Sequence, residues 1–187
     1  MGLNQLKDYI KHERAVPLSM DRLKSFVFKP NLKFMEYSKL VKARSLNAIL
    51  GHDGGVVILW DSEKNPKIGH YTLLYKSRGA VHYFDPLGFE MMKLASITGN
   101  NPQGLSRLLK GVHVRTNRVK YQSQREDTQS CGRHCCMRYN LKNFSDEQYR
   151  KLMTYSIQGR VMDMDDLVVL MTLPKDLSHW EKTLAKE

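Results

Sequence analysis

The sequence has no long apolar segment and few cysteines, and these two shortages exclude whole classes of protein. Its longest apolar runs, such as 56–60 and 167–171, fall well short of the roughly 20 residues that a membrane-spanning helix needs. The N-terminus lacks the apolar core of a secretion signal, so we expect no secretion and no membrane partner. The three cysteines are odd in number and two of them are adjacent, which argues against a disulfide framework and favours a reducing compartment.

Linkers are also missing. The chain contains no internal repeat, no low-complexity tract and no Gly/Ser-rich connector. Its 187 residues suffice for one compact domain with a real core and are few for two. We therefore expect a single domain over residues 1–187.

Acidic residues are scarce, and the formal net charge is +11. The segment 101–125 carries no acid, and its basic residues are Arg107, Lys110, Arg115, Arg118, Lys120 and Arg125. A second basic stretch, 22–44, contains only one acid, Glu36. Such fields attract polyanions, of which nucleic acid is the obvious one. The alternative, a charged surface that only aids solubility, is equally consistent with the sequence, because no base-reading motif accompanies the charge.

The pattern of apolar residues places strands in the middle of the chain and helices on both sides. The predicted strands are 56–60, 70–75, 81–85 and 112–121, and residues 77–79 are expected to join the second and third as a hairpin. Helices are predicted from Leu3, over 19–28 and 104–109, from Gly132, and after Ser145 as N-cap. The segment 163–173 could be strand or helix. This order predicts an α+β fold with a central sheet flanked by helices.

All three cysteines lie within a few residues of each other, in QSQREDTQSCGRHCCM (122–137). Cys131 stands at the N-terminal end of the predicted helix, where the helix dipole and free backbone N–H groups favour a thiolate nucleophile and an oxyanion. Gly132 would leave room for a substrate backbone. The alternatives are an inert buried thiol and a zinc site using Cys131, Cys135, Cys136 or His134, but the chain has no second cysteine pair for zinc. We interpret Cys135 and Cys136 as small core residues.

A cysteine nucleophile needs a base, and His70 is the best candidate. Hairpin geometry brings the start of 70–75 close to the end of 81–85, so Asp85 can orient the His70 imidazole. The rival bases are His82, His113 and His134, none of which has an evident acid to orient it. The alternative for Asp85 is a turn residue before Pro86.

The segment GHYTLLYKSRGAVHYFDPLGF (69–89), followed by 122–137, resembles the adenoviral-type maturation cysteine proteases (adenain-like). That family spans adenoviruses, virophages and related mobile elements, and shares a clan with the SUMO-specific proteases. The resemblance implies a mixed sheet, His70 as general base, Asp85 as its orienting acid and Cys131 as nucleophile. It also implies Gln124 as the oxyanion side chain, with Gln122 and Gln129 as alternatives. Tyr71 stands where the family usually has tryptophan.

The same resemblance implies a function. It predicts an endopeptidase that cuts viral capsid or structural precursor proteins during virion maturation, after small residues such as a Gly-Gly pair. No metal or other cofactor would be needed for the chemistry, while DNA and a peptide activator are candidate cofactors. The protein would be found in the virion, and in the host cytoplasm or nucleus during assembly. Two alternatives stay open: a SUMO- or ubiquitin-like-specific isopeptidase, and a non-catalytic DNA-binding protein with a protease fold.

Overall fold

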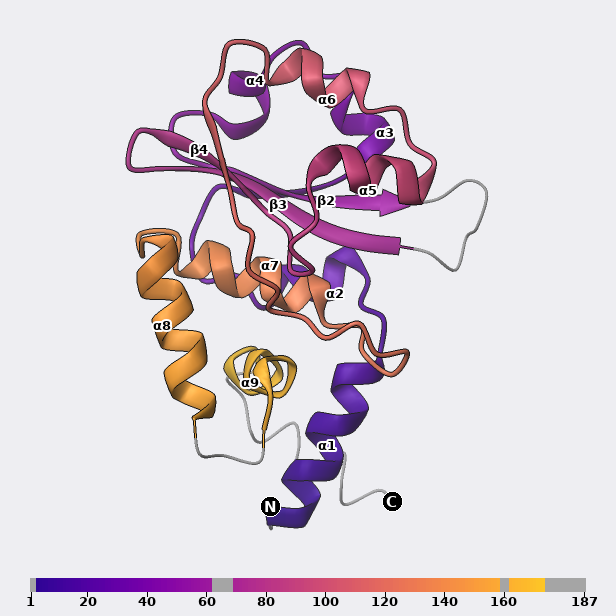
Figure 1. Ribbon diagram of the computed structural model, residues 1–187, viewed down its shortest axis with the longest axis vertical. Coiled ribbons are helices and arrows are strands. Elements are labelled where there is room, and N and C mark those ends of the chain that lie inside the picture. The colour runs from indigo at the N-terminus through magenta and orange to yellow at the C-terminus, as the bar shows by residue number, and fades with distance from the viewer. Residues whose placement is uncertain (1–2, 62–68, 159–161, 174–187) are drawn as a thin grey trace.

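A mixed five-stranded sheet forms the middle of the protein (Figure 1); the central mixed sheet is as expected, and it has one strand more than predicted. The structure is a computed structural model that describes residues 3–61, 69–158 and 162–173. The strands are β1 (Leu32–Glu36), β2 (Gly55–Asp61), β3 (Gly69–Ser77), β4 (Ala80–Phe84) and β5 (Val114–Thr116). They lie in the order β1-β2-β3-β4-β5. The two outer pairs are parallel and the two inner pairs antiparallel.

Helices cover both faces of this sheet, which confirms the α+β prediction. Their bounds are α1 (Leu3–Ala15), α2 (Met20–Lys24), α3 (Tyr37–Leu40), α4 (Leu46–Leu50), α5 (Met91–Thr98), α6 (Gln103–Leu108), α7 (Cys131–Asn140), α8 (Asp146–Ile157) and α9 (Met164–Met171). Helices α3 to α6 lie on one side of the sheet, and α7 and α2 on the other (Figure 1). Among the helices in the described ranges, none combines the length and apolarity needed to cross a membrane.

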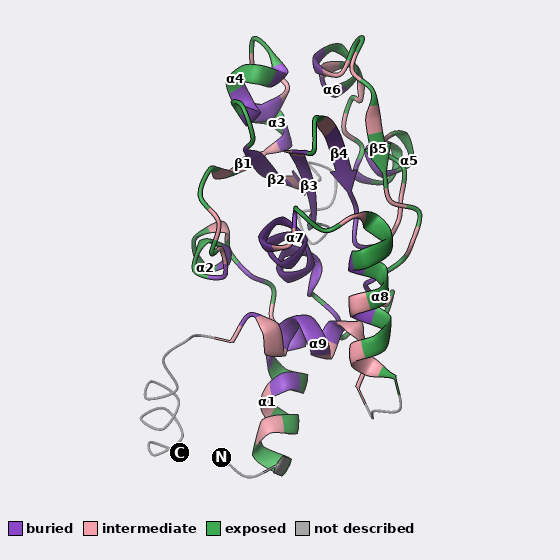
Figure 2. Cartoon of the chain, turned by 90° about the vertical axis from the view of Figure 1, so that its left-hand side faces the viewer, coloured by how far each residue is buried: buried purple, intermediate pink, exposed green. Residues whose placement is uncertain are grey.

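Two apolar cores follow from this layering, because side chains alternate between the faces of a strand. Val56 and Leu74 pack with α3 to α6, whereas Val57 and Leu73 pack with α2, α7, α8 and α9. Every residue of α7 is buried, and Figure 2 shows this helix at the centre of its layer. Cys135 and Cys136 are both fully buried in this core, as predicted.

The hairpin between β3 and β4 is also confirmed. Its two turn residues, Arg78 and Gly79, both have positive φ angles, of 50° and 72°, as in the type I′ turns that suit the twist of paired strands. The register pairs Leu73 with Phe84. The start of β3 therefore lies beside the chain that leaves β4.

Other predictions were wrong or incomplete. The predicted strand 112–121 is reduced to Val114–Thr116, because the Asn117 side chain turns to the backbone of Asp85 and the ladder stops there. The segment 163–173 is helical and begins with a capping box between Asp163 and Asp166. The helix predicted over 19–28 ends at Lys24, whereas the Ser145 N-cap is present. Strand β1 and helices α3, α4 and α5 were not predicted.

Candidate active site

His70 and Asp85 meet at the end of the hairpin. His70 Nε2 lies 2.8 Å from Asp85 Oδ1, and both side chains are buried. The same carboxylate oxygen accepts a hydrogen bond of 2.7 Å from the backbone N–H of Leu87. Because Nε2 faces Asp85, the other ring nitrogen, Nδ1, is left for a second partner.

Asn117 holds the backbone of Asp85, a role that sequence reasoning missed. Its Oδ1 accepts from the Asp85 N–H at 2.8 Å, and its Nδ2 donates to the Asp85 carbonyl at 2.7 Å. A third bond, of 3.0 Å, joins Nδ2 to the carbonyl of Val119. The two residues are 32 positions apart, so no local pattern could have indicated the pairing.

Cys131 is the second partner of His70. It is the first residue of α7, and Ser130 occupies the N-cap position. Burial lowers the pKa of His70, but hydrogen bonds to Asp85 and Cys131, together with the charges of these groups, outweigh burial and raise it to about 10. The raised pKa favours the imidazolium form of His70, which suits an ion pair with a thiolate.

The Cys131 thiol borders a cleft of about 560 Å³. One set of lining residues is apolar and comprises Leu87, Phe89, Leu94 and Ile97; the polar set comprises His70, Thr98, Gln122, Ser123, Gln124, Arg125, Thr128 and Gln129, and Gly69 completes the lining. The cleft therefore offers both an apolar contact surface and hydrogen-bonding groups beside the thiol.

All three candidate oxyanion glutamines line this cleft. Gln124 and Gln129 are exposed, and within the described part of the chain the Gln124 side chain makes no hydrogen bond. Gln122 is buried and its Nε2 donates to the Thr128 carbonyl at 3.4 Å. The amide of Gln124 is thus available to a ligand, and Gln122 and Gln129 stay as alternatives.

The rival histidines lie elsewhere. His82 stacks on Tyr75 with ring centroids 4.8 Å apart, and His113 is exposed between α6 and β5. His134 is buried and its Nε2 lies 3.0 Å from Asp165 Oδ1. The expectation that no acid orients His134 was therefore wrong, because Asp165 lies 31 residues further on and reaches it through the tertiary fold.

The other two thiols bond backbone carbonyls of neighbouring elements. Cys135 Sγ donates to the carbonyl of Tyr71, and Cys136 Sγ donates to that of Leu23. Among the described residues, no group of three or more His, Cys, Asp or Glu side chains is placed to hold a metal ion. Cys131, which is 5% exposed and lines the cleft, is thus the candidate nucleophile among the three thiols.

Gly132 serves close packing instead of substrate access. A Cβ atom added to it would lie 2.6 Å from Cδ1 of Leu23 in α2. The missing side chain therefore lets α2 approach α7, and the interpretation that this glycine leaves room for a substrate backbone was wrong.

Comparisons with known proteins give a limited set of similarities. No family model matches the chain. It is 26% identical over 148 residues to an uncharacterized protein, V9, of Sputnik virophage, which covers 73% of this chain and 83% of that protein. Among solved structures, it is similar to the C-terminal Ulp1 protease domain in complex with Smt3, the yeast ortholog of SUMO. That similarity has a TM-score of 0.36 and 11% identity, and it covers 88% of this chain and 76% of the other.

Proposed function

We propose that the protein is a cysteine endopeptidase with a Cys131–His70–Asp85 triad. The observation that carries the proposal is the buried His70 side chain, whose Nε2 is 2.8 Å from Asp85 and whose pKa is raised by hydrogen bonds to Asp85 and Cys131 at the edge of a cleft. A thiolate–imidazolium pair of this kind is an activated nucleophile. No metal ion takes part in the proposed chemistry.

The reaction follows from the roles of these groups. The Cys131 thiolate attacks the peptide carbonyl carbon, and the electron pair moves to the carbonyl oxygen. When the C–N bond breaks, the His70 imidazolium gives its proton to the leaving amine, and a thioester to Cys131 remains. Neutral His70 then takes a proton from water as the water attacks the thioester carbon. The C–S bond breaks, the acid product leaves, and the thiolate–imidazolium pair of Cys131 and His70 is regenerated.

The negative charge on the carbonyl oxygen needs donors. The backbone N–H of Cys131 lies at the first position of α7, where helical N–H groups have no partner within the helix. The side-chain amide of Gln124 is our choice for the second donor, since it is exposed in the same cleft. Removing one such donor typically lowers kcat by 10²–10³-fold.

The substrates we propose are viral structural precursor proteins, cut after small residues such as a Gly-Gly pair, during maturation in the virion. The identity with a virophage protein over most of both chains supports a viral setting. DNA is proposed as a polyanionic cofactor. The exposed basic residues Arg115, Arg118 and Lys120, on and after β5, support this, and their contacts should weaken steeply with salt.

The test is cleavage of a peptide library by wild type, Cys131→Ala and the matched control Cys135→Ala, each with and without DNA at low salt. We expect cleavage by wild type and the control, none by Cys131→Ala, and faster cleavage with DNA. Equal cleavage by Cys131→Ala would refute the nucleophile. Cleavage confined to folded ubiquitin-like fusions would indicate an isopeptidase, and DNA binding without any cleavage would indicate a binding protein.

A further inference from the structure

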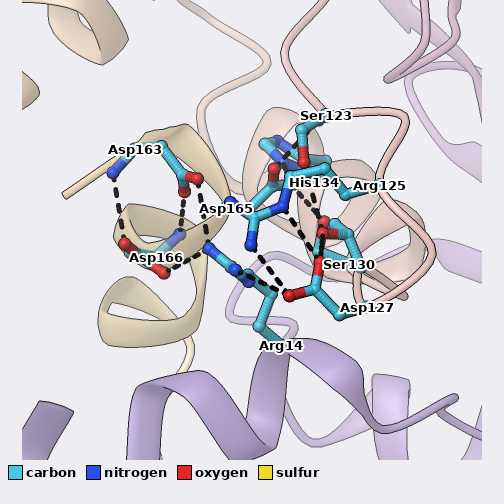
Figure 3. Close-up of polar contacts among 10 residues, drawn as sticks. Arg14, Ser123, Arg125, Asp127, Ser130, His134, Asp163, Asp165 and Asp166 are labelled. Atoms are coloured by element: carbon cyan, nitrogen blue, oxygen red, sulfur yellow. Dashed lines mark hydrogen bonds and ion pairs between the residues drawn. The ribbon is translucent and has the colours of Figure 1, made fainter.

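Behind the cleft lies a second buried polar cluster, centred on Asp165 in the first turn of α9 (Figure 3). The Asp165 side chain is 1% exposed and accepts hydrogen bonds from two other parts of the chain. Its Oδ1 accepts from the Ser130 hydroxyl and from His134 Nε2, at 3.0 Å for the latter. Its Oδ2 accepts from the backbone N–H of Ser123 at 2.9 Å. One carboxylate thus joins α9 to both the start of α7 and the segment that carries the glutamines.

These contacts fall directly beside the proposed oxyanion donors. Ser130 precedes Cys131, whose backbone N–H is one donor, and Ser123 lies between Gln122 and Gln124. A serine at the N-cap usually bonds the first N–H groups of its own helix. Ser130 makes no such bond: its backbone is in the αR region, at φ −91° and ψ 0°, instead of extended, and its hydroxyl donates to Asp165. The first N–H groups of α7 are therefore not capped by this side chain and can face a ligand.

The cluster contains the residue types of a serine hydrolase triad but not its arrangement. Ser130 and His134 are fully buried, so no substrate can reach them. Both donate to the same carboxylate oxygen, whereas a nucleophilic serine would donate to the histidine. Burial raises the pKa of Asp165, but the hydrogen bond and charge of His134, with the bonds from Ser130 and Ser123, outweigh burial and lower it. The ionised carboxylate is suited to hold its three donors in place.

A second set of contacts fixes the same elements. Arg14, at the end of α1, bonds Asp163, the N-cap of α9, at 3.1 Å and Asp166 in α9 at 3.0 Å (Figure 3). It also reaches Asp127 at 3.4 Å, in the segment 122–129, which lines much of the cleft and is called the cleft segment below. The carbonyl of Arg14 also accepts from the backbone N–H of Gln129 at 2.8 Å. Helix α9 and the cleft segment are therefore tied to a common anchor, so Asp165 acts from a fixed position.

We infer that Asp165 is a positioning residue that sets the spacing between the two halves of the oxyanion site, the start of α7 and the segment 122–124. The inference rests on the proposed function, since an oxyanion forms only if Cys131 attacks a carbonyl. Asp165 itself touches neither substrate nor the reacting atoms. Its loss should weaken stabilisation of the tetrahedral intermediate and leave the reactivity of the thiolate nearly unchanged.

The test compares wild type, Asp165→Asn and Asp146→Asn. Asp146 is the matched control because its carboxylate, on α8, bonds Arg138 at the opposite end of α7, at 2.8 Å. Five quantities are measured: kcat and KM on a cleaved peptide, the dissociation constant of a short peptide aldehyde ending in glycinal, the alkylation rate of Cys131 by iodoacetamide, and the midpoint of thermal unfolding. The aldehyde forms a tetrahedral adduct that uses the oxyanion site, whereas alkylation needs only the thiolate.

For Asp165→Asn we expect a kcat lower by about 10–100-fold, with aldehyde binding weakened by a similar factor. KM and the alkylation rate should stay within about threefold of wild type, and Asp146→Asn should match wild type in kcat, KM, aldehyde binding and alkylation. Wild-type kcat in Asp165→Asn would overturn the inference. So would parallel losses of kcat, alkylation and thermal stability, which would indicate a merely structural role.

Ser130→Ala keeps the test decisive if Asp165→Asn does not fold. It removes one donor and leaves the bonds of Asp165 to His134 and Ser123. We expect weaker aldehyde binding at an unchanged alkylation rate, and unchanged aldehyde binding would overturn the inference. If wild type neither cleaves peptides nor binds the aldehyde, the proposed function fails instead.

Discussion

Replacing Asp85 with asparagine should weaken the support that this residue gives to the imidazolium form of His70. Asp85 Oδ1 accepts from His70 Nε2 at 2.8 Å and from the Leu87 N–H at 2.7 Å, which leaves Nδ1 to exchange a proton with Cys131. An asparagine would keep its carbonyl oxygen at this position, because an amide NH₂ group there would face the Leu87 N–H, a second donor. The orientation of the ring is therefore kept, while the negative charge beside the imidazolium is lost.

The size of the effect follows from the loss of the charge. Burial lowers the pKa of His70, and the bonds and charges of Asp85 and Cys131 raise it from 6.5 to about 10, with the hydrogen bond to Asp85 as the largest favourable contribution. A hydrogen bond to a charged partner stabilises by about 1.5–3 kcal/mol, and one between neutral groups by about 0.5–1.5 kcal/mol. We therefore expect kcat/KM of Asp85→Asn to fall by about 10–100-fold at neutral pH.

The pH dependence of activity tests the direction of the His70 pKa shift. The imidazolium must protonate the leaving amine, so wild-type activity should fall as the pH rises through about 10. In Asp85→Asn the His70 pKa should be lower, and the fall should begin nearer neutral pH. The same bond stabilises the folded state fully below the ordinary pKa of 6.5, and that stabilisation is lost as the pH rises through about 10.

The assay is kcat/KM on a cleaved peptide over this pH range, with Asp146→Asn as a control that removes a carboxylate bonded to Arg138 outside the cleft. Circular dichroism establishes that each variant is folded. Activity of Asp85→Asn within about threefold of wild type, with the same alkaline limit, would refute the role of Asp85 as the orienting acid.

Three further predictions concern the free energy of unfolding, each measured by urea unfolding. Glu13→Gln removes the charge partner of Arg133, whose side chain is 1% exposed, and should lower the free energy of unfolding by about 3–5 kcal/mol. A decrease below about 1 kcal/mol would mean that the pair behaves like a surface ion pair. Gly132→Ala places a Cβ 2.6 Å from Leu23 and should lower it by about 1–3 kcal/mol, whereas an unchanged value would show that α2 can shift to make room. Gly79→Ala places a side chain at φ +72° in open space and should lower it by about 1 kcal/mol with unchanged activity. Lost activity in this variant would show that the hairpin turn affects the site.

Local chemistry allowed much of the candidate site to be predicted. His70 lies near the start of β3 and Asp85 directly follows β4, and a two-residue turn joins these two strands. Their proximity therefore follows from strand register over a short distance in the chain. The helix predicted from Gly132 begins one residue earlier, at Cys131, as α7. The α+β class also followed from sequence, because apolar periodicity and turn residues are local signals.

Only the tertiary structure decided which distant groups support that site. Asn117 bonds Asp85 across 32 residues of sequence, and Asp165 bonds His134 across 31, and no local sequence pattern predicts either pair. Burial at those positions depends on how α9 and the segment after β5 pack, and an unpaired carboxylate or amide there would be costly. The sequence by itself therefore indicated the candidate triad, with His70 and Asp85 from the hairpin and Cys131 from the start of a helix. The fold selected the side chains that hold these residues, since those contacts exist only after the layers have packed.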